Sequence, residues 1–432
     1  MSMAGDIPAT GRRHLVLVAY YFPPLGGSGV QRVAKWAKYL PQNGWDVTVL
    51  TVEPGSYFAF DQTLLEEVEA AGVRIIRTRS LDPTRVARKG KAIRMPSERK
   101  RRIFSWLTGL FFVPDNKRGW IAHAQKAFEE VASGSVVDLV LSSAPPYTSL
   151  MVGDELSKFL GVPHVVDYRD DWLENPRHRY PTPLHKGWHR RQERAVLQNA
   201  SAVITINESI GQLLEQRHKD AHIKVFPQGF DPEDFSEHQP AGIGNRLVLL
   251  YSGMFYDAQQ PDTLLKAVAS LQDRDPDLKE RLELRFIGLF PDEKKSLLES
   301  LNLEELVSIG GYLTHEQATA ELMAADVLWM TVGHQEGEHM ISTGKLHEYM
   351  GSRKPILALA PDGEVRKALS GYEAAWTVMP DDVGSTAKVL TVLLAKHAEG
   401  SLPAGDAAWI ERYDRKRQAC DLSVFLASLV SA

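Results

Sequence analysis

The stretch Ile341-Ser342-Thr343-Gly344-Lys345-Leu346-His347-Glu348-Tyr349-Met350, followed by GSRKPIL at residues 351–357, has the pattern of a turn, a helix and a strand. Residues 327–332 ahead of it form an apolar run of strand length. Gly344 and the small residues beside it allow backbone N–H groups at a helix start to approach an anion closely. Lys345 adds a positive charge, and Glu348 lies one turn further along the same helix face. A phosphate at Lys345 and a sugar hydroxyl at Glu348 would together describe a nucleotide diphosphate; the alternative is a capped surface helix with a solvated Lys and Glu.

A second glycine-rich turn lies near the start of the chain. Residues 14–21 read as a strand that Pro23-Pro24 ends, and residues 30–40 carry apolar side chains at helical spacing. Between them stand Gly26-Gly27-Ser28-Gly29, whose spacing is neither that of a Rossmann fingerprint nor that of a Walker A loop. The turn is either a tight connection or a place where backbone meets a ligand at the positive end of a helix.

The alternation of strands and helices continues along both halves of the chain. It predicts parallel sheets with right-handed crossovers, and 432 residues suit two domains better than one. A polar stretch with Pro and Gly, residues 231–245, separates the halves. We therefore expect domains at 1–232 and 233–411.

Composition narrows the class of protein further. The only cysteine, Cys420, excludes an internal disulfide and suits a reducing cytoplasm. The net charge of −5 offers no general argument for nucleic-acid binding. Met1 to Arg13 is a polar stub without the pattern of a secretory signal. The apolar run 103–114 is too short to span a bilayer, which requires about 20 residues.

A basic segment directly precedes that apolar run. Residues 85–102 carry nine Lys or Arg residues against Glu98 alone, and aromatic residues follow them. This pairing predicts an in-plane contact with an anionic membrane surface; the alternative is a solvated basic loop followed by a core helix. Nucleic acid fits less well, because the charge is confined to one loop. The predicted contact residues are Arg99, Lys100, Arg101, Arg102, Phe104, Trp106, Phe111 and Phe112.

A third cluster of polar residues follows the apolar residues 162–166. It reads Asp167-Tyr168-Arg169-Asp170-Asp171-Trp172, at the carboxyl end of a predicted strand, where open α/β sheets bind ligands. A carboxylate beside an arginine can orient an acceptor hydroxyl or hold the arginine for a phosphate. A structural ion pair that closes the loop is the alternative.

Taken in order, these segments resemble family-4 retaining glycosyltransferases, and among them the enzymes of bacterial exopolysaccharide and surface-polysaccharide pathways. The resemblance rests on Tyr21-Phe22-Pro23-Pro24-x-Gly26-Gly27, on Asp-Tyr-Arg-Asp-x-Trp at 167–172, and on the stretch 341–357. It implies the GT-B architecture: two doubly wound Rossmann-like α/β domains face a cleft, one binding the acceptor and the other the donor. It also implies that the final residues, 412–432, pack back on the N-terminal domain.

The resemblance assigns roles to particular residues. In the family a Lys binds the donor diphosphate and a Glu binds the ribose, positions that Lys345 and Glu348 match. The implied donor-binding residues are Gly26, Gly27, Gly253, Thr343, Gly344, Lys345, Leu346 and Glu348. The implied catalytic residues are Lys345, Arg169 and Asp170, and the implied acceptor-side residues are Asp167, Tyr168 and Trp172.

Three positions depart from the family pattern. Met340 stands where the family carries a leading Glu, and Met254 and Gln259 stand where many members carry an Arg and a Lys on the diphosphate. More of the phosphate charge would then fall on Lys345 and on backbone N–H groups, with Arg169 as a helper from the other domain.

The implied reaction is the transfer of a sugar, with retained anomeric configuration, from a nucleoside diphosphate to a hydroxyl of a lipid-linked saccharide. UDP is the family's common nucleotide. The resemblance implies a hexosyltransferase without metal or other cofactor, acting in polysaccharide biosynthesis in the cytoplasm at the inner face of the plasma membrane. Two alternatives stay open: a UDP-sugar 2-epimerase and a non-catalytic scaffold of the same fold. A dinucleotide dehydrogenase is disfavoured, because a G-x-G-x-x-G fingerprint with a downstream ribose-binding acid is absent from the sequence.

Overall fold

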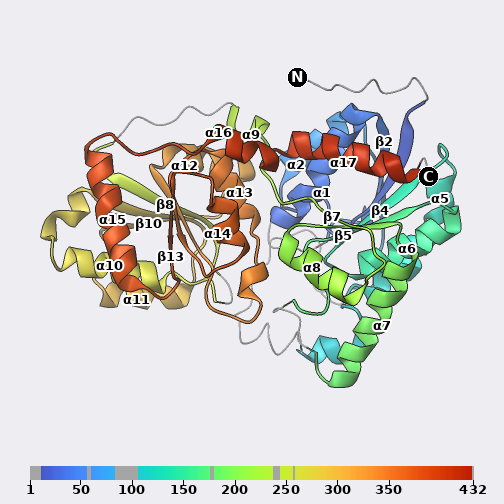
Figure 1. Cartoon of the computed structure of the whole chain (residues 1–432), viewed down its shortest axis with the longest axis horizontal. Helices are drawn as coiled ribbons and strands as arrows, with labels where there is room; N and C mark the ends of the chain where they lie inside the picture. The colour runs from blue at the N-terminus through green and yellow to red at the C-terminus, as the bar shows by residue number, and fades with distance from the viewer. Residues whose placement is uncertain are drawn as a thin grey trace.

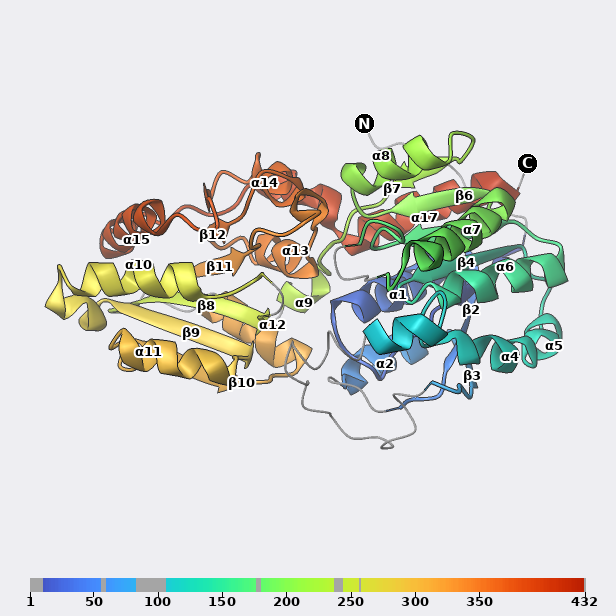
Figure 2. The ribbon, with the colours of Figure 1, turned by 90° about the horizontal axis from the view of Figure 1, so that it is seen from below.

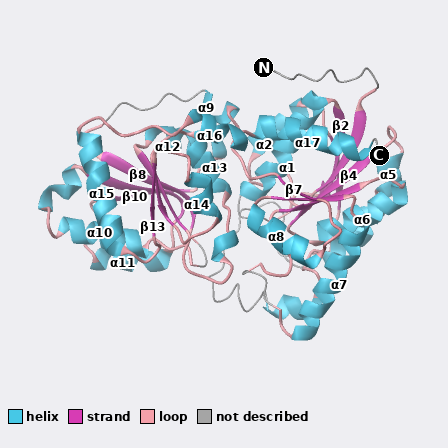
Figure 3. Cartoon of the chain, in the orientation of Figure 1, coloured by secondary structure: helices cyan, strands magenta, loops and turns pink. Residues whose placement is uncertain are grey.

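The computed structural model describes residues 11–55, 60–82, 106–175, 180–236, 244–255 and 258–430, arranged as two α/β halves (Figure 1). In Figure 3 the strands form two separate sheets, each enclosed by helices. The first sheet has seven strands in the order β3-β2-β1-β4-β5-β6-β7, and the second has six in the order β10-β9-β8-β11-β12-β13. Every neighbouring pair within the two sheets is parallel. The prediction of two doubly wound domains is confirmed.

The strands of the first half are β1 (Arg13–Val18), β2 (Trp45–Val52), β3 (Arg74–Thr78), β4 (Leu139–Ala144), β5 (His164–Tyr168), β6 (Ala202–Thr205) and β7 (Ile223–Val225). Its helices are α1 (Ser28–Tyr39), α2 (Gln62–Ala70), α4 (Ile121–Gln125), α5 (Phe128–Ala132), α6 (Thr148–Leu160), α7 (Pro183–Asn199) and α8 (Glu208–Arg217). Residues 106–111 are also helical, and α9 (Glu233–Ser236) lies in the connection to the second half.

The strands of the second half are β8 (Leu247–Met254), β9 (Leu282–Leu289), β10 (Val307–Gly311), β11 (Val327–Thr331), β12 (Ile356–Leu359) and β13 (Ala375–Val378). Its helices are α10 (Asp262–Gln272), α11 (Lys295–Ser300), α12 (His315–Ala324), α13 (Gly344–Gly351), α14 (Glu364–Leu369), α15 (Val383–Ala398) and α16 (Ala407–Ile410). The last helix, α17 (Arg415–Val430), follows a short 3₁₀ turn at Glu411–Tyr413.

Alternating side chains of each central strand supply a core on both faces of its sheet. In β1, Leu15 and Leu17 pack with α1, α2 and α17, whereas Val16 and Val18 pack on the opposite face with α4, α5 and α6. Such strands are apolar on both faces because helices cover both of them. The second sheet repeats this arrangement, with α10, α11 and α15 over one face and α12, α13 and α14 over the other.

The C-terminal helix returns to the first half, as predicted. Figure 1 shows α17 crossing from the second half to lie beside α1. Its Leu422, Phe425 and Leu426 are buried in the core of the first half, and the Trp45 indole N–H donates to Ser423 Oγ at 3.0 Å. Among the described residues, no helix is both long enough and apolar enough to cross a bilayer.

Candidate functional site

A cleft of about 560 Å³ lies between the two halves, at the carboxyl ends of both sheets. A volume of this size is typical of a pocket for a small-molecule ligand, and parallel sheets bind ligands at this edge. The first half contributes Gly26, Gly27, Arg169 and Asp170, among others. The second half contributes Gly253, Thr343, Gly344, Lys345 and Glu348, among others. The cleft therefore brings together most of the predicted donor-site residues and part of the predicted acceptor segment.

The start of α13 positions Lys345 and Glu348 on the cleft wall. Thr343 caps the helix, because its hydroxyl accepts a hydrogen bond from the Leu346 N–H at 3.3 Å. Gly344 is buried at the first helical position, and both Lys345 and Glu348 line the cleft one turn apart. The side chain of Leu346 is fully buried in the core beneath the helix. The structure therefore corrects the prediction for Leu346: it anchors the helix, and its N–H is already bonded to the cap.

Lys345 lies in an unusual environment for a lysine. Its ammonium sits over the ring of Tyr251, 3.7 Å from the ring centroid. A Cβ atom at Gly253, whose φ is 123°, would lie 3.2 Å from both Nζ and Cε of Lys345. Burial lowers the pKa of Lys345 to about 7, although the nearby Glu348 carboxylate acts in the opposite direction. A lysine whose charge is this poorly compensated favours an anion beside it.

The glycine-rich turn of the first half is held against the cleft by Arg169. Its Nη1 donates to the Gly29 carbonyl at 2.5 Å, its Nε donates to the Ala144 carbonyl at 3.2 Å, and its Nη2 donates to the Pro145 carbonyl. Since all three guanidinium nitrogens bind backbone carbonyls, Arg169 joins the start of α1 to the end of β4. Its geometry is that of a residue that positions the glycine loop, on which Gly26 and Gly27 face the cleft.

The structure buries both ends of the segment 167–172 inside the first half. Asp167 is fully buried and accepts hydrogen bonds from Arg32 Nη2 at 3.0 Å and from Ser143 Oγ at 2.6 Å. Tyr168 is also fully buried in the first half. Trp172 stacks on Tyr147 with ring centroids 4.6 Å apart.

This placement corrects the acceptor-side prediction. The side chains of Asp167, Tyr168 and Trp172 belong to the interior of the first half, and the part of the segment that lines the cleft is 169–171. The reason is the strand itself: β5 is buried on both faces, so its last residues face the two cores and only the turn after it reaches the cleft.

Several cleft residues were not singled out from the sequence. They include Gln31, Asp61 and His315. His315 begins α12 after the short turn that follows β10, and this position near the carboxyl end of a strand is the signal that could have identified it. Met340 also lines the cleft, and its carbonyl accepts a hydrogen bond from Asn207 Nδ2 of the first half at 2.9 Å.

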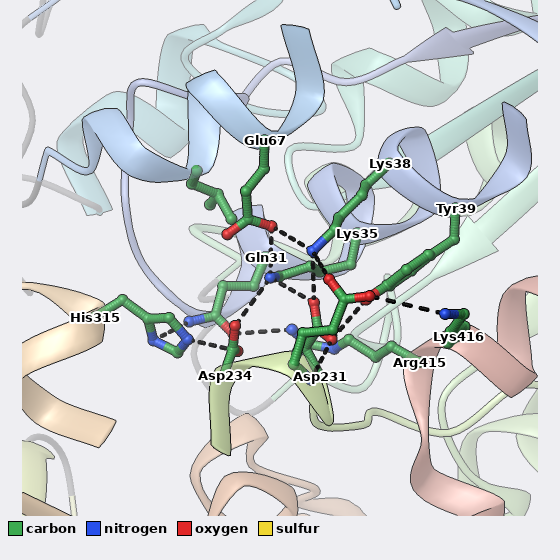
Figure 4. A network of polar contacts seen from close by, with 12 residues as sticks. Gln31, Lys35, Lys38, Tyr39, Glu67, Asp231, Asp234, His315, Arg415 and Lys416 are labelled. Carbon is green, nitrogen blue, oxygen red and sulfur yellow. Dashed lines mark hydrogen bonds and ion pairs between the residues drawn. The ribbon is translucent and has the colours of Figure 1, made fainter. Parts of the chain in front are cut away.

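A buried polar network joins the two halves beside the cleft (Figure 4). Lys35 of α1 is fully buried and contacts Asp231 at 2.5 Å and Asp234 at 3.1 Å, both in the connecting segment. Asp234 also contacts Nε2 of His315 at 2.7 Å. Burial disfavours the charged form of His315, but the hydrogen bond and the charge of Asp234 outweigh it and raise the pKa of His315.

Gln31 completes the network. Its side-chain amide lies 3.0 Å from Nδ1 of His315 and accepts a hydrogen bond from Arg415 of α17 at 2.9 Å. The network thus connects α1, the connecting segment, α12 and α17. Its composition favours one relative placement of the two halves, because separating them would leave buried charges without partners.

The predicted membrane segment is described only in part. Arg99, Lys100, Arg101, Arg102 and Phe104 lie outside the described residues. Trp106 is 45% exposed and Phe111 is 80% exposed, whereas Phe112 is half-buried. Within the described ranges, no group of three or more His, Cys, Asp or Glu side chains is arranged to hold a metal ion.

Comparison with known proteins agrees with this architecture. Residues 26–229 match the family described as "Glycosyl transferase 4-like domain", and residues 233–401 match "Glycosyl transferases group 1". A 156-residue stretch is 28% identical to a D-inositol 3-phosphate glycosyltransferase of Nocardiopsis dassonvillei. That stretch covers 32% of this chain and 36% of the relative's length.

Three solved structures share the fold over nearly the whole chain. Sucrose-phosphate synthase from Thermosynechococcus elongatus has a TM-score of 0.66 at 17% identity, covering 97% of this chain and 100% of that one. Anabaena HepE in complex with UDP-glucose has a TM-score of 0.57 at 18% identity (96% and 100%). WaaG, a glycosyltransferase involved in lipopolysaccharide biosynthesis, has a TM-score of 0.56 at 16% identity (96% and 97%).

Two parallel-sheet domains that enclose a cleft at their carboxyl edges define the GT-B fold. With a glycosyl transferase 4-like domain followed by a group 1 domain, the chain belongs to the glycosyltransferases of this fold.

Proposed function

We propose that the chain transfers a sugar from a nucleoside diphosphate sugar to a hydroxyl group of an acceptor. The proposed nucleotide is UDP, the common one of the family. The observation that carries this proposal is Lys345 on the cleft wall, with a pKa lowered to about 7 and Glu348 one helical turn away. Burial removes the water that would otherwise stabilise the ammonium of Lys345, and a negatively charged diphosphate beside it would stabilise that charge instead. A ribose hydroxyl at Glu348 would follow from the spacing of the two side chains on α13.

The chemistry requires stabilisation of the diphosphate as it leaves. Positive charge at that point comes from Lys345 and from the N-terminal ends of α13 and α1, which both face the cleft. For this reason we propose that transfer is metal-independent. The family resemblance is the basis for proposing a hexosyltransferase that retains the anomeric configuration. Asp170 lies on the opposite wall and is the proposed orienting group for the acceptor hydroxyl. Closure of the two domains would exclude water.

The proposed acceptor is a lipid-linked saccharide in bacterial surface-polysaccharide assembly. The exposed Trp106 and Phe111 support it, together with the basic residues 85–102 that precede them in sequence. The likeness in fold to WaaG and to HepE with its bound UDP-glucose is compatible with this pathway and with UDP. The protein would then act in the cytoplasm, as a peripheral protein at the inner face of the plasma membrane.

Calorimetric titration of UDP and GDP, without metal, tests the donor site. Wild type is expected to bind UDP, and Lys345→Ala is expected to lose about 2 kcal/mol or more of binding free energy. Lys158→Ala is the matched control, because Lys158 is an exposed surface lysine paired with Asp154 on α6. If neither nucleotide binds wild type, the proposed reaction is wrong. If UDP binds equally well to Lys345→Ala, the donor site is elsewhere.

A non-catalytic scaffold is the second candidate. It is favoured by Met254 and Met340, apolar side chains that line the cleft at two positions where the family carries charged residues. Release of UDP from UDP-sugars in the presence of a saccharide acceptor distinguishes the two, because a scaffold would bind without turnover. The same assay, analysed for a changed sugar in the nucleotide product, detects a 2-epimerase.

A further inference from the structure

The outer face of α7 combines arginines with exposed apolar side chains. Leu184 is 85% exposed and Trp188 is 51% exposed. They stand four residues apart, and Arg191 continues the same helix face. Arg190 and Arg194 are exposed on the adjacent row. A folded protein ordinarily covers Trp and Leu side chains that gather in this way, unless they serve an interaction.

The charge of this face has a single sign. The one acidic residue of α7, Glu193, is fully buried and points inward, where Arg217 contacts it at 3.0 Å and His218 contacts it at 3.2 Å. Lys186 is half-buried and pairs with Glu174. The three arginines of the outer face therefore lie on a helix whose exposed positions carry no acid.

A second exposed apolar element adjoins the start of α7. Figures 1 and 2 show the short helix of residues 106–111 beside it, and Nε2 of His185 lies 3.4 Å from the Leu110 carbonyl. This helix exposes Trp106, Leu107 and Phe111. Two helices from distant parts of the sequence thus present aromatic and aliphatic side chains close to one another.

The combined surface lies near the first-half wall of the cleft. The Tyr180 hydroxyl donates to the Trp172 carbonyl at 2.8 Å, and Lys186 contacts Glu174 at 3.0 Å. These contacts tie the start of α7 to residues 172–175, and Asn175 lines the cleft. A molecule held at this surface would have one end close to the proposed acceptor position.

We propose that the outer face of α7, together with the helix at 106–111, is a docking surface for an anionic lipid bilayer. Tryptophan and phenylalanine partition to the boundary between head groups and acyl chains, while arginines contact the lipid phosphates. The absence of exposed acids on α7 matches the negative charge of such a surface. This inference rests on the proposed lipid-linked acceptor, and it adds α7 to the basic segment predicted from the sequence.

Flotation of the full-length protein with vesicles tests the surface. Phosphatidylcholine vesicles with and without phosphatidylglycerol are the probes, and wild type is expected to float only with the anionic ones. The variant R190Q/R191Q/R194Q is expected to bind about 100-fold more weakly, at roughly a fivefold loss per arginine. Leu184→Ser with Trp188→Ser is expected to weaken binding to the anionic vesicles as well, because two apolar side chains no longer enter the boundary between head groups and acyl chains.

The matched control is Lys388→Gln with Val392→Ser on α15 of the second half, where both side chains are also exposed. It is expected to bind as wild type does. If both α7 variants bind anionic vesicles as strongly as wild type does, the proposal is overturned. A loss of binding that follows only from neutralising Arg99–Arg102 would overturn it too.

A fluorescent label gives a second readout that does not depend on a destabilising change. In a Cys420→Ser background, Leu184→Cys or Val392→Cys carries an environment-sensitive dye. Anionic vesicles are expected to shift the emission to the blue at position 184 only, and no shift there would overturn the proposal. UDP calorimetry needs no vesicles, so UDP binding without vesicle binding refutes the surface alone, and the reverse result refutes the donor site alone.

Discussion

Donor binding is expected to take up a proton at Lys345. Burial lowers the pKa of this lysine to about 7 in the free protein, so that its amine is mostly neutral above that pH. A diphosphate in contact with it favours the charged form and raises its pKa on binding. Well below pH 7 the lysine is already charged, so that it adds no further change in affinity there. Above pH 7 affinity should fall, because each binding event must first protonate the amine.

The size of this fall in UDP affinity follows from the lowered pKa of Lys345. At about pH 9, two units above the pKa of the free protein, about one molecule in a hundred carries the proton, which costs about 2.7 kcal/mol. Because Lys345 is charged in about half of the molecules at pH 7, UDP affinity should fall about 50-fold between about pH 7 and 9, provided that the pKa of the complex stays above 9. The terminal phosphate of UDP loses its second proton near pH 6 and contributes no change in this range.

Calorimetry at several pH values, in buffers with different ionisation enthalpies, measures both the affinity and the protons taken up. Lys345→Met should bind UDP more weakly at pH 7 and should show no proton uptake from this residue. Lys345→Arg keeps its charge throughout and should give a flat profile. If the UDP affinity of Lys345→Met still changes with pH, that change comes from other titrating groups, such as His315. A flat wild-type profile, or a slope unchanged in Lys345→Met, would refute the reasoning.

Three further outcomes are expected. Lys35→Met should destabilise the protein by about 3–5 kcal/mol in a thermal melt, because it removes the fully buried positive charge that lies between Asp231 and Asp234, whereas Lys158→Met at an exposed pair should cost about 0.5 kcal/mol or less. Gly288→Ala should lower the melting temperature and weaken UDP binding, since its Cβ would clash with the Gly253 carbonyl and its φ is 104°; an unchanged melt would contradict this. Asp170→Asn should lower sugar transfer by about 100-fold or more while UDP affinity stays the same; equal turnover would exclude a role for this carboxylate.

Much of the fold and one wall of the cleft could be predicted from local sequence. The strands β8, β11 and β12 are short apolar runs, and each central strand is buried on both faces, so that its pattern is readable without partners. Thr343, Lys345 and Glu348 lie within six consecutive residues, where the geometry of a single helix turn sets their relation. The predicted return of the last helix to the first half was also correct, but it rested on the family resemblance.

Other properties arise only where distant segments meet. Nothing near Asp167 in the sequence indicates that Arg32 would neutralise it inside the core, or that Arg169 would be held by carbonyls of α1 and of the loop after β4. The lowered pKa of Lys345, on the helix α13, depends on burial against Tyr251, which lies on the strand β8.

The orientation of the charged side chains on α7 is also decided by contacts between distant segments. The sequence shows three arginines and one glutamate on this helix, but Arg217 and His218 on and beside α8 draw Glu193 inward and leave the arginines outside. Helices and strands follow from covalent geometry and the spacing of apolar residues along a few turns of chain. The burial and pairing of a charge depend on which remote groups pack around it, and that is decided only when the chain has folded.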